Sequence, residues 1–385
     1  MQVIKIVIIY CLRVLLRLFY IIPINERKIL FVSWKGKRYA CNPKYIFEYI
    51  YNLCPDKYIY VWSLRNKENL SANFSNVQVC GFLTLNYIYT AMTAKYIVNN
   101  MAIEPIFPFR KKQKIIYTWH GGGAYKIEGD VAAFEKRRWS RMIMRDIRSK
   151  MISHAISSCE KFTLFHSESW KVSQDTFLPI GMPRNDIFFS HDDNIKDKVY
   201  KYYNINNNKK LVLYAPTYRG DSHFAAQVKQ NFNLDVEDIL RLLKNKYGED
   251  FLFLYRAHYI IKDKEYNTPN IILASDYPDM QELLYAVDIL ITDYSSSMWD
   301  FSFTFKPCFL FTPDLDEYIE KQGFYTPIEE WPFPVAKTNE QLMANIKYFD
   351  SEAYTTAVKN HHKVLGSYEH GTATKKLFDM IFNDE

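Results

Sequence analysis

The amino-acid sequence predicts an α/β protein built from two Rossmann-like halves, each with a doubly wound parallel sheet. Two observations lead to this fold class. Short apolar strands alternate with amphipathic helices along most of the chain, and the alternation starts a second time beyond residue 190. The length of 385 residues also fits two domains of ordinary size. We therefore expect the two halves to face a cleft.

The expected strands are apolar runs that belong inside a sheet. Those of the first half are residues 28–34, 58–64, 95–100, 114–120 and 154–159, and the segment 42–53 is a typical helix between them. Those of the second half are residues 210–216, 250–258, 271–275, 289–294 and 307–312.

The boundary between the halves is expected in the segment 177–189, where Gly181 and Pro183 stand in a polar setting. Residues 25–180 are therefore assigned to an amino-terminal domain and residues 181–385 to a carboxyl-terminal domain. The chain after Lys337 is expected to form helices that cross back toward the first half.

The composition excludes several classes of protein. Hydrophobic residues make up 48% of the chain, which argues against disorder. The net charge of +6 suits an anionic ligand or a lipid surface, but Lys and Arg are not clustered as they are in nucleic-acid binding proteins. The six cysteines form no CxxC pair and no zinc-like spacing, so we expect a reducing compartment. Nothing in the sequence predicts an oligomeric state.

Residues 1–24 are expected to form a basic amphipathic helix that ends at Pro23. Gln2, Lys5, Arg13 and Arg17 would fall within about a third of the helix circumference, opposite a broad apolar face. This pattern is typical of a helix that lies in a membrane interface. A helix packed on the protein's own core or on a partner is the alternative, while a membrane span would have to bury two arginines.

Four polar clusters begin where an expected strand ends: TWHGGGAYK, YAPTYRGD, YRAH and ITDYSSS. Ligands of open parallel sheets bind outside the carboxyl ends of the strands. We therefore expect the four clusters, one from the first half and three from the second, to converge on one crevice.

The serine cluster of the second half predicts an anion site. Ser295 is expected to cap a helix that begins near Ser296, so that the free N–H groups of its first turn and the hydroxyls of Ser296 and Ser297 could hold a phosphate. Plain helix capping is the alternative interpretation, and it needs only one of the serines.

Arg219, Arg256 and His258 add cationic or protonatable groups at the expected strand ends. Arg256 and His258 are two residues apart, so their side chains would point the same way and could touch one diphosphate. Each of them alone would more often be a surface or packing residue. The residues predicted to hold the phosphates and nucleotide of a donor are Pro216, Thr217, Arg219, Arg256, Thr292, Asp293, Ser295, Ser296 and Ser297.

His120 is the candidate catalytic residue of the first half, because an imidazole can take a proton from an attacking hydroxyl. A histidine that only hydrogen-bonds its loop is the alternative. The three glycines that follow would permit a tight turn and the close approach of a ligand. The residues predicted on this side are Gly121, Gly122, Gly123, Lys126 and Asp130, and those predicted between the domains are Arg184, Asn185 and Asp186.

A metal site is not indicated. Asp314-Leu315-Asp316 has the form of a DxD motif, but it continues into Glu317 and is better explained as the acidic start of a helix. We therefore expect no required cofactor and no metal, and the positive charge at the site would come from the protein itself.

Taken together, the motifs resemble those of the CDP-glycerol glycerophosphotransferases, which build teichoic acids and related capsule polymers. They are WHGGGAYKIEGD, GMPRND, LYAPTYR, RAH and DMQELLYAVDILITDYSSSMWDFSFTFKPCFLF, in this order, within residues 115–325. The resemblance implies a GT-B type fold, peripheral attachment to the cytoplasmic membrane face, and transfer of a polyol phosphate from a CDP-activated donor to a lipid-linked saccharide.

In that family the histidines of the WHG and RxH motifs form the essential pair, which implies catalytic roles for His120 and His258; which of them is the base stays open. Members often read WHGTPLK and RxHP, whereas this chain has GGGAY after His120 and Tyr259 after His258. The pocket walls therefore differ, and CDP-ribitol is an alternative donor to CDP-glycerol. Two competing hypotheses are a GT-B glycosyltransferase that uses a nucleotide sugar and a non-catalytic, membrane-associated scaffold that binds nucleotide.

Overall fold

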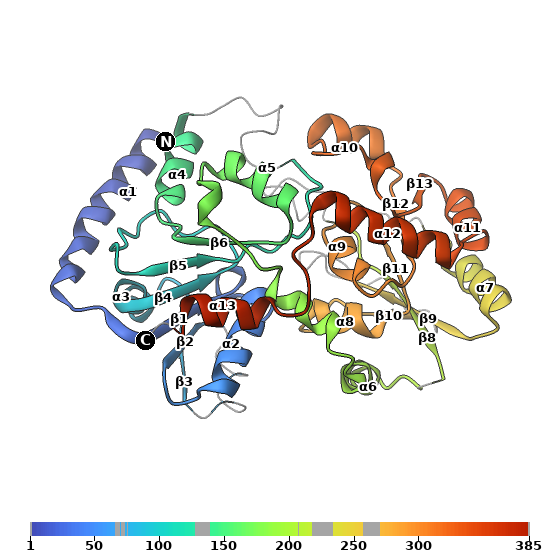
Figure 1. Ribbon diagram of the computed structural model, residues 1–385, viewed down its shortest axis with the longest axis horizontal. Coiled ribbons are helices and arrows are strands. Elements are labelled where there is room, and N and C mark those ends of the chain that lie inside the picture. Colours follow the sequence, from blue (N-terminus) through green and yellow to red (C-terminus); the bar gives the residue numbers. More distant parts are fainter. Residues whose placement is uncertain are drawn as a thin grey trace. The chain divides into compact units, whose positions relative to one another are not determined.

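The computed structural model describes residues 2–65, 70, 74, 76–127, 139–206, 208–217, 234–256 and 270–383 (Figure 1). The chain folds into two compact units. The first contains residues 1–121, 128–186 and 367–385, and the second contains residues 122–127 and 187–366. The predicted division after residue 180 thus differs from the compact units in three segments. Residues 181–186 and 367–385 belong to the first unit, and residues 122–127 belong to the second.

The first unit contains a seven-stranded parallel sheet with the strand order β3-β2-β1-β4-β5-β6-β7. Its strands are β1 (Asn25–Val32), β2 (Ile59–Ser63), β3 (Val77–Cys80), β4 (Ala94–Asn99), β5 (Lys114–Tyr117), β6 (His154–Ser157) and β7 (Phe177–Pro179). Five of these were expected, whereas β3 and β7 are short runs that the apolar pattern did not single out. The order reverses direction between β1 and β4, which makes their carboxyl ends a topological switch point.

Helices cover both faces of this sheet. They are α1 (Gln2–Leu16), α2 (Cys41–Leu53), α3 (Leu85–Thr93), α4 (Trp139–Ser149), α5 (Glu160–Trp170) and α13 (Ala373–Ile381), with 3-10 turns η1 (Arg17–Ile21), η2 (Trp34–Gly36), η4 (Gln174–Thr176) and η5 (Pro183–Phe189). Successive strand residues face opposite sides. Phe31 stacks with Trp62 and meets Phe47 of α2, while Leu30 and its neighbours pack in the core on the other side.

The second unit contains a six-stranded parallel sheet with the order β10-β9-β8-β11-β12-β13. Its strands are β8 (Lys210–Tyr214), β9 (Phe251–Tyr255), β10 (Ile271–Leu273), β11 (Ile289–Thr292), β12 (Cys308–Phe311) and β13 (Val335–Ala336). Its helices are α6 (Asp193–Tyr202), α7 (Val236–Tyr247), α8 (Met280–Ala286), α9 (Ser297–Ser302), α10 (Leu315–Lys321), α11 (Asn339–Lys347) and α12 (Ser351–Leu365), with the 3-10 turn η6 (Ile328–Glu330). Its switch point lies between β8 and β11.

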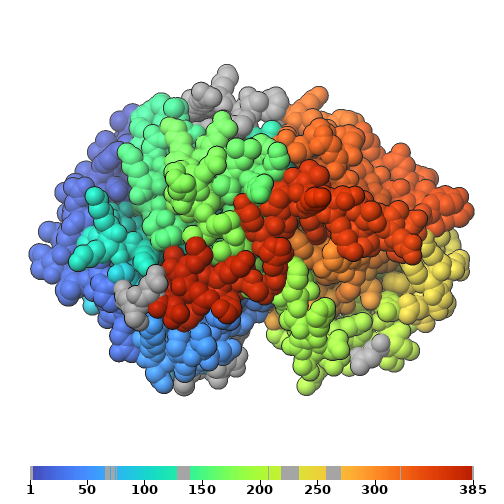
Figure 2. Space-filling view, in the orientation of Figure 1, coloured from blue at the N-terminus to red at the C-terminus, as the bar shows by residue number. Residues whose placement is uncertain are grey.

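The carboxyl-terminal segment returns to the first unit, as the sequence predicted for the chain after Lys337. Helix α12 ends at Leu365, and its C-cap residue Gly366 adopts the left-handed conformation (φ 65°). The amide of Tyr368 then donates to Ser158 O over 2.9 Å. Helix α13 contacts α2, and the space-filling view shows this red segment on the surface of the first unit (Figure 2).

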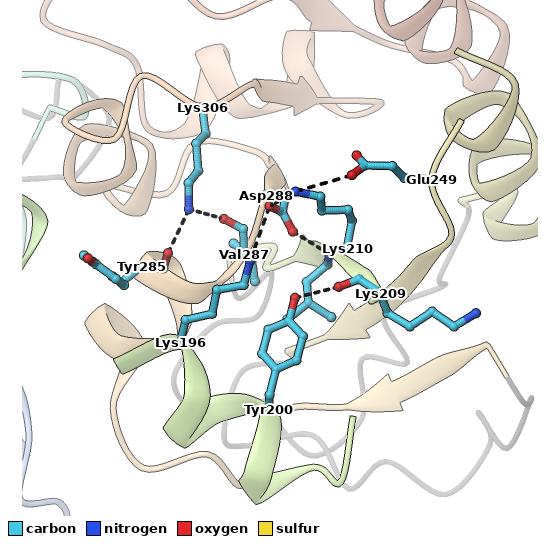
Figure 3. A network of polar contacts seen from close by, with 10 residues as sticks. Lys196, Tyr200, Lys209, Lys210, Glu249, Tyr285, Val287, Asp288 and Lys306 are labelled. Carbon is cyan, nitrogen blue, oxygen red and sulfur yellow. Dashed lines mark hydrogen bonds and ion pairs between the residues drawn. The ribbon is translucent and has the colours of Figure 1, made fainter. Parts of the chain in front are cut away.

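A network of lysines lies at the amino ends of the strands in the second sheet (Figure 3). Asp288 accepts from the amide of Leu211 at 2.8 Å and forms ion pairs with Lys210 at 3.6 Å and Lys196 at 4.0 Å. Lys306 donates to the carbonyl oxygens of Tyr285 and Val287, both at 2.8 Å. Burial lowers the pKa of Lys306 to about 8. This network ties the end of α8 to the start of β12, at the sheet edge opposite the predicted site.

Candidate functional site

His120 lies in the loop that follows β5, at the carboxyl edge of the first sheet. Its imidazole ring is 4.0 Å from the ring of Trp119 and 4.9 Å from the ring of Trp34, measured between centroids. Nδ1 is 3.0 Å from the carbonyl oxygen of Asn100. A carbonyl oxygen can only accept a hydrogen bond, so Nδ1 carries the proton and Nε2 carries the lone pair of the neutral ring. This arrangement gives His120 the tautomer that a general base working through Nε2 needs.

Two buried asparagines hold the backbone around His120. Asn100 follows β4 directly, and its Oδ1 accepts from the amide of Trp34 over 2.9 Å. Asn42, in the first turn of α2, donates through Nδ2 to the carbonyl oxygens of Thr118 at 3.0 Å and Trp119 at 3.2 Å. Trp119 has a left-handed backbone (φ 52°), which is costly for a bulky residue and is maintained here by these contacts. The sequence motifs did not single out either asparagine. The only indication in the sequence was position, since Asn100 ends an expected strand and Asn42 begins an expected helix.

The glycines after His120 accommodate an indole ring of the same compact unit. A Cβ atom on Gly122 would lie 2.3 Å from Cδ1 of Trp299, and one on Gly123 would lie 2.4 Å from Cε2 of Tyr125. Gly123 also has a left-handed backbone (φ 66°). At Gly122 and Gly123 the missing side chains are therefore explained by protein packing, and the predicted approach of a ligand to this loop stays a prediction.

The segment that follows the glycines is anchored in the second unit. The Oη atom of Tyr125 is 3.1 Å from Nε2 of His361, and the carbonyl oxygen of Tyr125 accepts from the amide of Tyr325 at 2.8 Å. Lys126 forms an isolated antiparallel bridge with Phe324. Asp130, predicted on the same side, lies outside the described residues.

The serine cluster follows β11 at the switch point of the second sheet. Helix α9 begins at Ser297, one residue later than predicted, and its N-cap residue is Ser296, whose side chain makes no capping bond. Instead, Ser295 Oγ accepts from the amide of Ser297 at 3.3 Å and from its hydroxyl at 3.0 Å. Ser295 therefore contacts the first turn of the helix, as predicted, although the N-cap residue is Ser296 and not Ser295.

Thr292 and Asp293 fix the loop that follows β8. Thr292 donates through Oγ1 to the carbonyl oxygen of Ala215 at 2.7 Å. Asp293 accepts from the amide of Thr217 at 2.8 Å and from its hydroxyl at 2.6 Å. The structure thus brings Pro216, Thr217, Thr292, Asp293 and the serines to one sheet edge, and it gives Thr292 and Asp293 a positioning contact.

Arg256 lies at the end of β9, as predicted. Its Nη1 donates to the carbonyl oxygens of Ala274 at 2.6 Å and Tyr277 at 2.9 Å. These bonds fix the guanidinium beside the segment that follows β10. The other two predicted residues of this group, Arg219 and His258, lie outside the described residues, so their predicted roles stay predictions.

The three residues predicted between the domains lie in the first unit. Arg184 is buried, and its amide donates to Oδ1 of Asn42 at 3.1 Å. Asn185 donates through Nδ2 to Glu369 over 3.0 Å. Asp186 accepts from the amides of Ala373 at 2.9 Å and Thr374 at 2.8 Å, so it satisfies the first turn of α13. Burial raises the pKa of Asp186, and these amides oppose that shift.

The DxD-like residues serve other contacts. Asp314 accepts from Tyr294 Oη at 3.0 Å, and Asp316 pairs with Lys337 at 3.0 Å. Helix α10 begins at Leu315, in agreement with the interpretation as an acidic helix start. Among the residues that the structure describes, no group of three or more His, Cys, Asp or Glu side chains is placed to hold a metal ion.

Related proteins match the chain over nearly its whole length. The family described as CDP-Glycerol:Poly(glycerophosphate) glycerophosphotransferase matches residues 14–383. The teichoic acid poly(glycerol phosphate) polymerase of Bacillus spizizenii is 29% identical over 96% of this chain and 95% of its own length. The corresponding polymerase of Staphylococcus epidermidis is 30% identical, but the chain spans only 51% of it. The poly(ribitol-phosphate) polymerase of Bacillus spizizenii is 27% identical over 94% of this chain and 57% of its own length.

Solved structures show the same architecture. The wall teichoic acid polymerase TagF, as a histidine variant soaked with CDPG, superposes with a TM-score of 0.84 at 26% identity and covers 100% of this chain and 96% of that one. A UDP-GlcNAc 2-epimerase from Neisseria meningitidis has a TM-score of 0.52 at 14% identity over 93% of this chain and all of that one, and thus shares the fold alone. The fold is the predicted GT-B type, with two parallel-sheet, Rossmann-like units. The chain therefore belongs to the CDP-glycerol:poly(glycerophosphate) glycerophosphotransferase family.

Proposed function

We propose that this protein transfers a polyol phosphate from a CDP-activated donor to a hydroxyl group of a lipid-linked acceptor and releases CMP, in the synthesis of a teichoic acid or a capsule-type polymer. The observation that carries the reaction class is the family match over residues 14–383. Glycerol phosphate is the group we expect. Ribitol phosphate is the second candidate, because relatives named for either polyol match at 29% and 27% identity.

In the proposed reaction, the acceptor hydroxyl attacks the β-phosphorus of the CDP-polyol, and Nε2 of His120 takes the hydroxyl proton. The bond between the β-phosphorus and the bridging oxygen breaks, and CMP leaves with the electron pair. The hydrogen bond from Nδ1 to Asn100 O supports this role, because it leaves the lone pair on Nε2. Solved TagF structures include variants of two histidines, which fits a reaction that depends on a histidine pair.

His258 is the proposed second histidine, which would neutralise charge on the leaving phosphate or protonate it. The loops after β8 and β11 are the proposed donor site. They carry Pro216, Thr217 and the serine cluster, and they lie at the switch point where ligands of doubly wound sheets bind. Arg219 and Arg256 would supply the positive charge that the diphosphate needs.

We further propose that α1 and η1 bind the cytoplasmic membrane surface peripherally. The structure contains no helix, within its described residues, that is long and apolar enough to cross a membrane. Helix α1 packs on the first unit through Ile6 and Ile9, which are 8% and 5% exposed. Its outer face is apolar, and Ile4 at 63%, Val7 at 53% and Leu15 at 59% are largely exposed.

Arg13 faces the protein rather than solvent, in contrast to the expected basic stripe. It donates through Nη1 to the carbonyl oxygens of Pro105 and Phe107, both at 2.7 Å. One face of α1 is therefore fastened to the protein by polar bonds while apolar side chains remain outside. This orientation supports docking into a lipid interface, because binding there would remove the exposed apolar side chains of α1 from contact with water.

The reaction is tested by measuring nucleotide release from purified protein. CDP-glycerol, CDP-ribitol, a UDP-sugar and a GDP-sugar are each supplied with a lipid-linked saccharide acceptor. We expect CMP and a phosphodiester-linked product from a CDP-polyol only. Release of UDP or GDP would support a glycosyltransferase instead, and the lack of turnover with every donor would support the binding scaffold.

A further inference from the structure

The indole of Trp34 lies against the imidazole of His120, although the two residues are far apart in the sequence. The ring centroids are 4.9 Å apart, and the ring planes are tilted by 53°. Both residues belong to the first compact unit. Trp34 begins the 3-10 turn η2 after β1, and His120 follows β5. The contact therefore joins the carboxyl ends of two strands of the same sheet.

Asn100 binds both residues of this ring pair. Its Oδ1 accepts from the amide of Trp34 at 2.9 Å, and its carbonyl oxygen is 3.0 Å from Nδ1 of His120. Asn100 is completely buried, and its Nδ2 donates to Ser33 Oγ at 3.4 Å. A buried polar group that loses its partner is costly. One asparagine thus fixes the backbone of Trp34 and the ring of His120 relative to each other.

The turn that presents the indole has a costly backbone. Trp34 and Lys35 are both left-handed, with φ values of 49° and 55°, which is unusual for bulky residues. Arg65 maintains the turn by donating its amide to Gly36 O at 2.7 Å and its Nε to Lys35 O at 3.2 Å. Backbone strain that the surrounding structure maintains in this way is concentrated at functional sites.

Core packing does not explain the position of the Trp34 indole. Trp34 is only half-buried and does not belong to the buried core. Within the residues that the structure describes, His120 is the one aromatic ring that it contacts. Trp119, by contrast, contacts Tyr117 and Trp170 in addition to His120. The position of the Trp34 indole is therefore better explained by an effect on the imidazole.

An indole attracts the protonated form of an imidazole more strongly than the neutral form. The face of the indole carries negative partial charge, and it attracts a cation within about 6 Å of the ring centroid. In the proposed reaction His120 becomes such a cation when Nε2 takes the hydroxyl proton. Its hydrogen bond from Nδ1 to Asn100 O then also becomes charge-assisted. The ring pair thus favours the state that the reaction forms over the state that precedes it.

We infer that Trp34 is a positioning residue for the transfer reaction, and that its indole stabilises the imidazolium form of His120. This inference rests on the proposed function, in which His120 is the base. The proton balance of that reaction is unchanged. The acceptor O–H proton moves to Nε2 as the bond to phosphorus forms, and the indole exchanges neither a proton nor an electron. Removing the aromatic face should therefore lower the pKa of His120 and slow transfer.

Charged side chains also surround the ring pair, and the test must keep them constant. Those on the flanking segments of the first unit are Lys35, Lys37, Arg38, Arg65 and Glu104. Lys35 forms an ion pair with Glu104 at 3.2 Å. An exchange of the indole for another uncharged side chain leaves all of these charges in place. A difference in the pKa of His120 between such variants then reports the aromatic face itself.

Deuterium exchange at Cε1 of the imidazole, followed by mass spectrometry at a series of pH values, measures the pKa of His120 without substrate. Trp34→Leu keeps an apolar side chain without an aromatic face, and Trp34→Phe keeps a smaller face. Trp139→Leu is the matched control, since Trp139 is 47% exposed on α4 of the same unit. We expect the pKa of His120 to fall by about half a pH unit or more in Trp34→Leu, by less in Trp34→Phe, and not to change in the control.

Transfer assays test the consequence for the reaction. A less stabilised imidazolium loses its proton at lower pH, so the acid limb of the kcat/KM profile should move to lower pH in Trp34→Leu. Its kcat on the plateau should fall by about threefold to tenfold, with the CDP-glycerol KM unchanged. A purely structural role would lower activity without moving the acid limb. Trp34→Met replaces Trp34→Leu if the latter does not fold.

Equal pKa values of His120 in Trp34→Leu and Trp34→Phe, or a higher value in Trp34→Leu than in wild type, would overturn the inference. The indole would then act through packing or burial. An unchanged kcat in Trp34→Leu would overturn it as well. A lower pKa in Trp34→Leu, combined with no CMP release by the wild-type protein, would instead leave the effect of the indole standing and contradict the proposed function.

Discussion

The indole of Trp299 fills the space that a side chain at Gly122 would need. A Cβ atom at Gly122 would come within 2.3 Å of Cδ1 and 2.9 Å of Nε1 of a ring that is completely buried. Gly122 follows His120 by two residues, so the glycine is required by packing close to the proposed base. The second and third glycines of this loop, Gly122 and Gly123, therefore have a steric explanation within the protein itself.

Replacing Gly122 with Ala should reduce kcat strongly. Because the indole is enclosed, the backbone of the loop must shift instead, and His120 would shift with it. We expect a loss of kcat of at least about tenfold, since displacement of a catalytic group by a fraction of a bond length is costly. The melting temperature should fall by a few degrees at most. The double variant Gly122→Ala with Trp299→Phe, which has a smaller ring, should recover part of the activity; wild-type kcat in the single variant would contradict this explanation.

Replacing His120 with Ala should abolish transfer without unfolding the protein. We expect a loss of about a hundredfold or more in kcat, which is the usual contribution of a general base. His370→Ala is the matched control, because His370 is exposed and belongs to the same compact unit. CMP release by the two variants, measured beside their circular dichroism spectra, separates a catalytic loss from a folding defect. Full activity of the His120 variant would reject its role as the base.

Polar substitutions on the outer face of α1 should weaken membrane binding. Ile4→Gln, Val7→Gln and Leu15→Gln together remove apolar area from side chains that are more than half exposed, so folding should be unaffected. We expect most of the protein to stay in the supernatant when it is sedimented with anionic phospholipid vesicles. Leu53→Gln with Leu85→Gln is the control, since these residues are 57% and 86% exposed elsewhere on the first unit. Equal sedimentation of both variants and wild type would exclude α1 as the docking surface.

Lys306 should contribute a distinct pH dependence to stability. Burial lowers its pKa in the folded protein to about 8 from the ordinary 10.5. Between these values the unfolded chain binds more protons than the folded protein, so this group makes the free energy of unfolding rise with pH. The rise is on the order of 3 kcal/mol at most. Urea denaturation at several pH values from 7.5 to about 10.5 should show a steeper upward trend for wild type than for Lys306→Met. Parallel trends would mean that the amine titrates normally.

The sequence correctly predicted that His120 lies at the carboxyl edge of the first sheet and that Thr217 and the serines lie at the carboxyl edge of the second, for a simple reason. Polar clusters that follow buried parallel strands must lie at the carboxyl edge, so the placement of His120, Thr217 and the serines followed from the strand pattern alone. The contacts of Asn42 and Asn100 could not be predicted in this way. Their side chains bind backbone groups that are brought close only by the fold, and an asparagine beside a helix or strand is common for many other reasons.

Tertiary packing also explains the other differences. The glycine pattern shows that side chains are missing but not what occupies their space, which at Gly122 is Trp299 and at Gly123 is Tyr125. Arg256 was placed correctly at the end of β9, but the carbonyl groups that bind its guanidinium come from residues about twenty positions later in the chain. Strands β3 and β7 are too short for their periodicity to stand out from the surrounding sequence.

The return of residues 367–385 to the first unit has a consequence for how the protein is made. Glu369 accepts from the amide of Met182 and from Asn185, and Asp186 satisfies the start of α13, so the first unit needs residues that the ribosome adds only after the whole second unit. During translation the amino-terminal sheet must wait for the entire second unit to emerge before these buried polar groups find their partners. A nascent chain stalled before residue 367 should therefore expose its first unit to proteases even when the second unit is already folded.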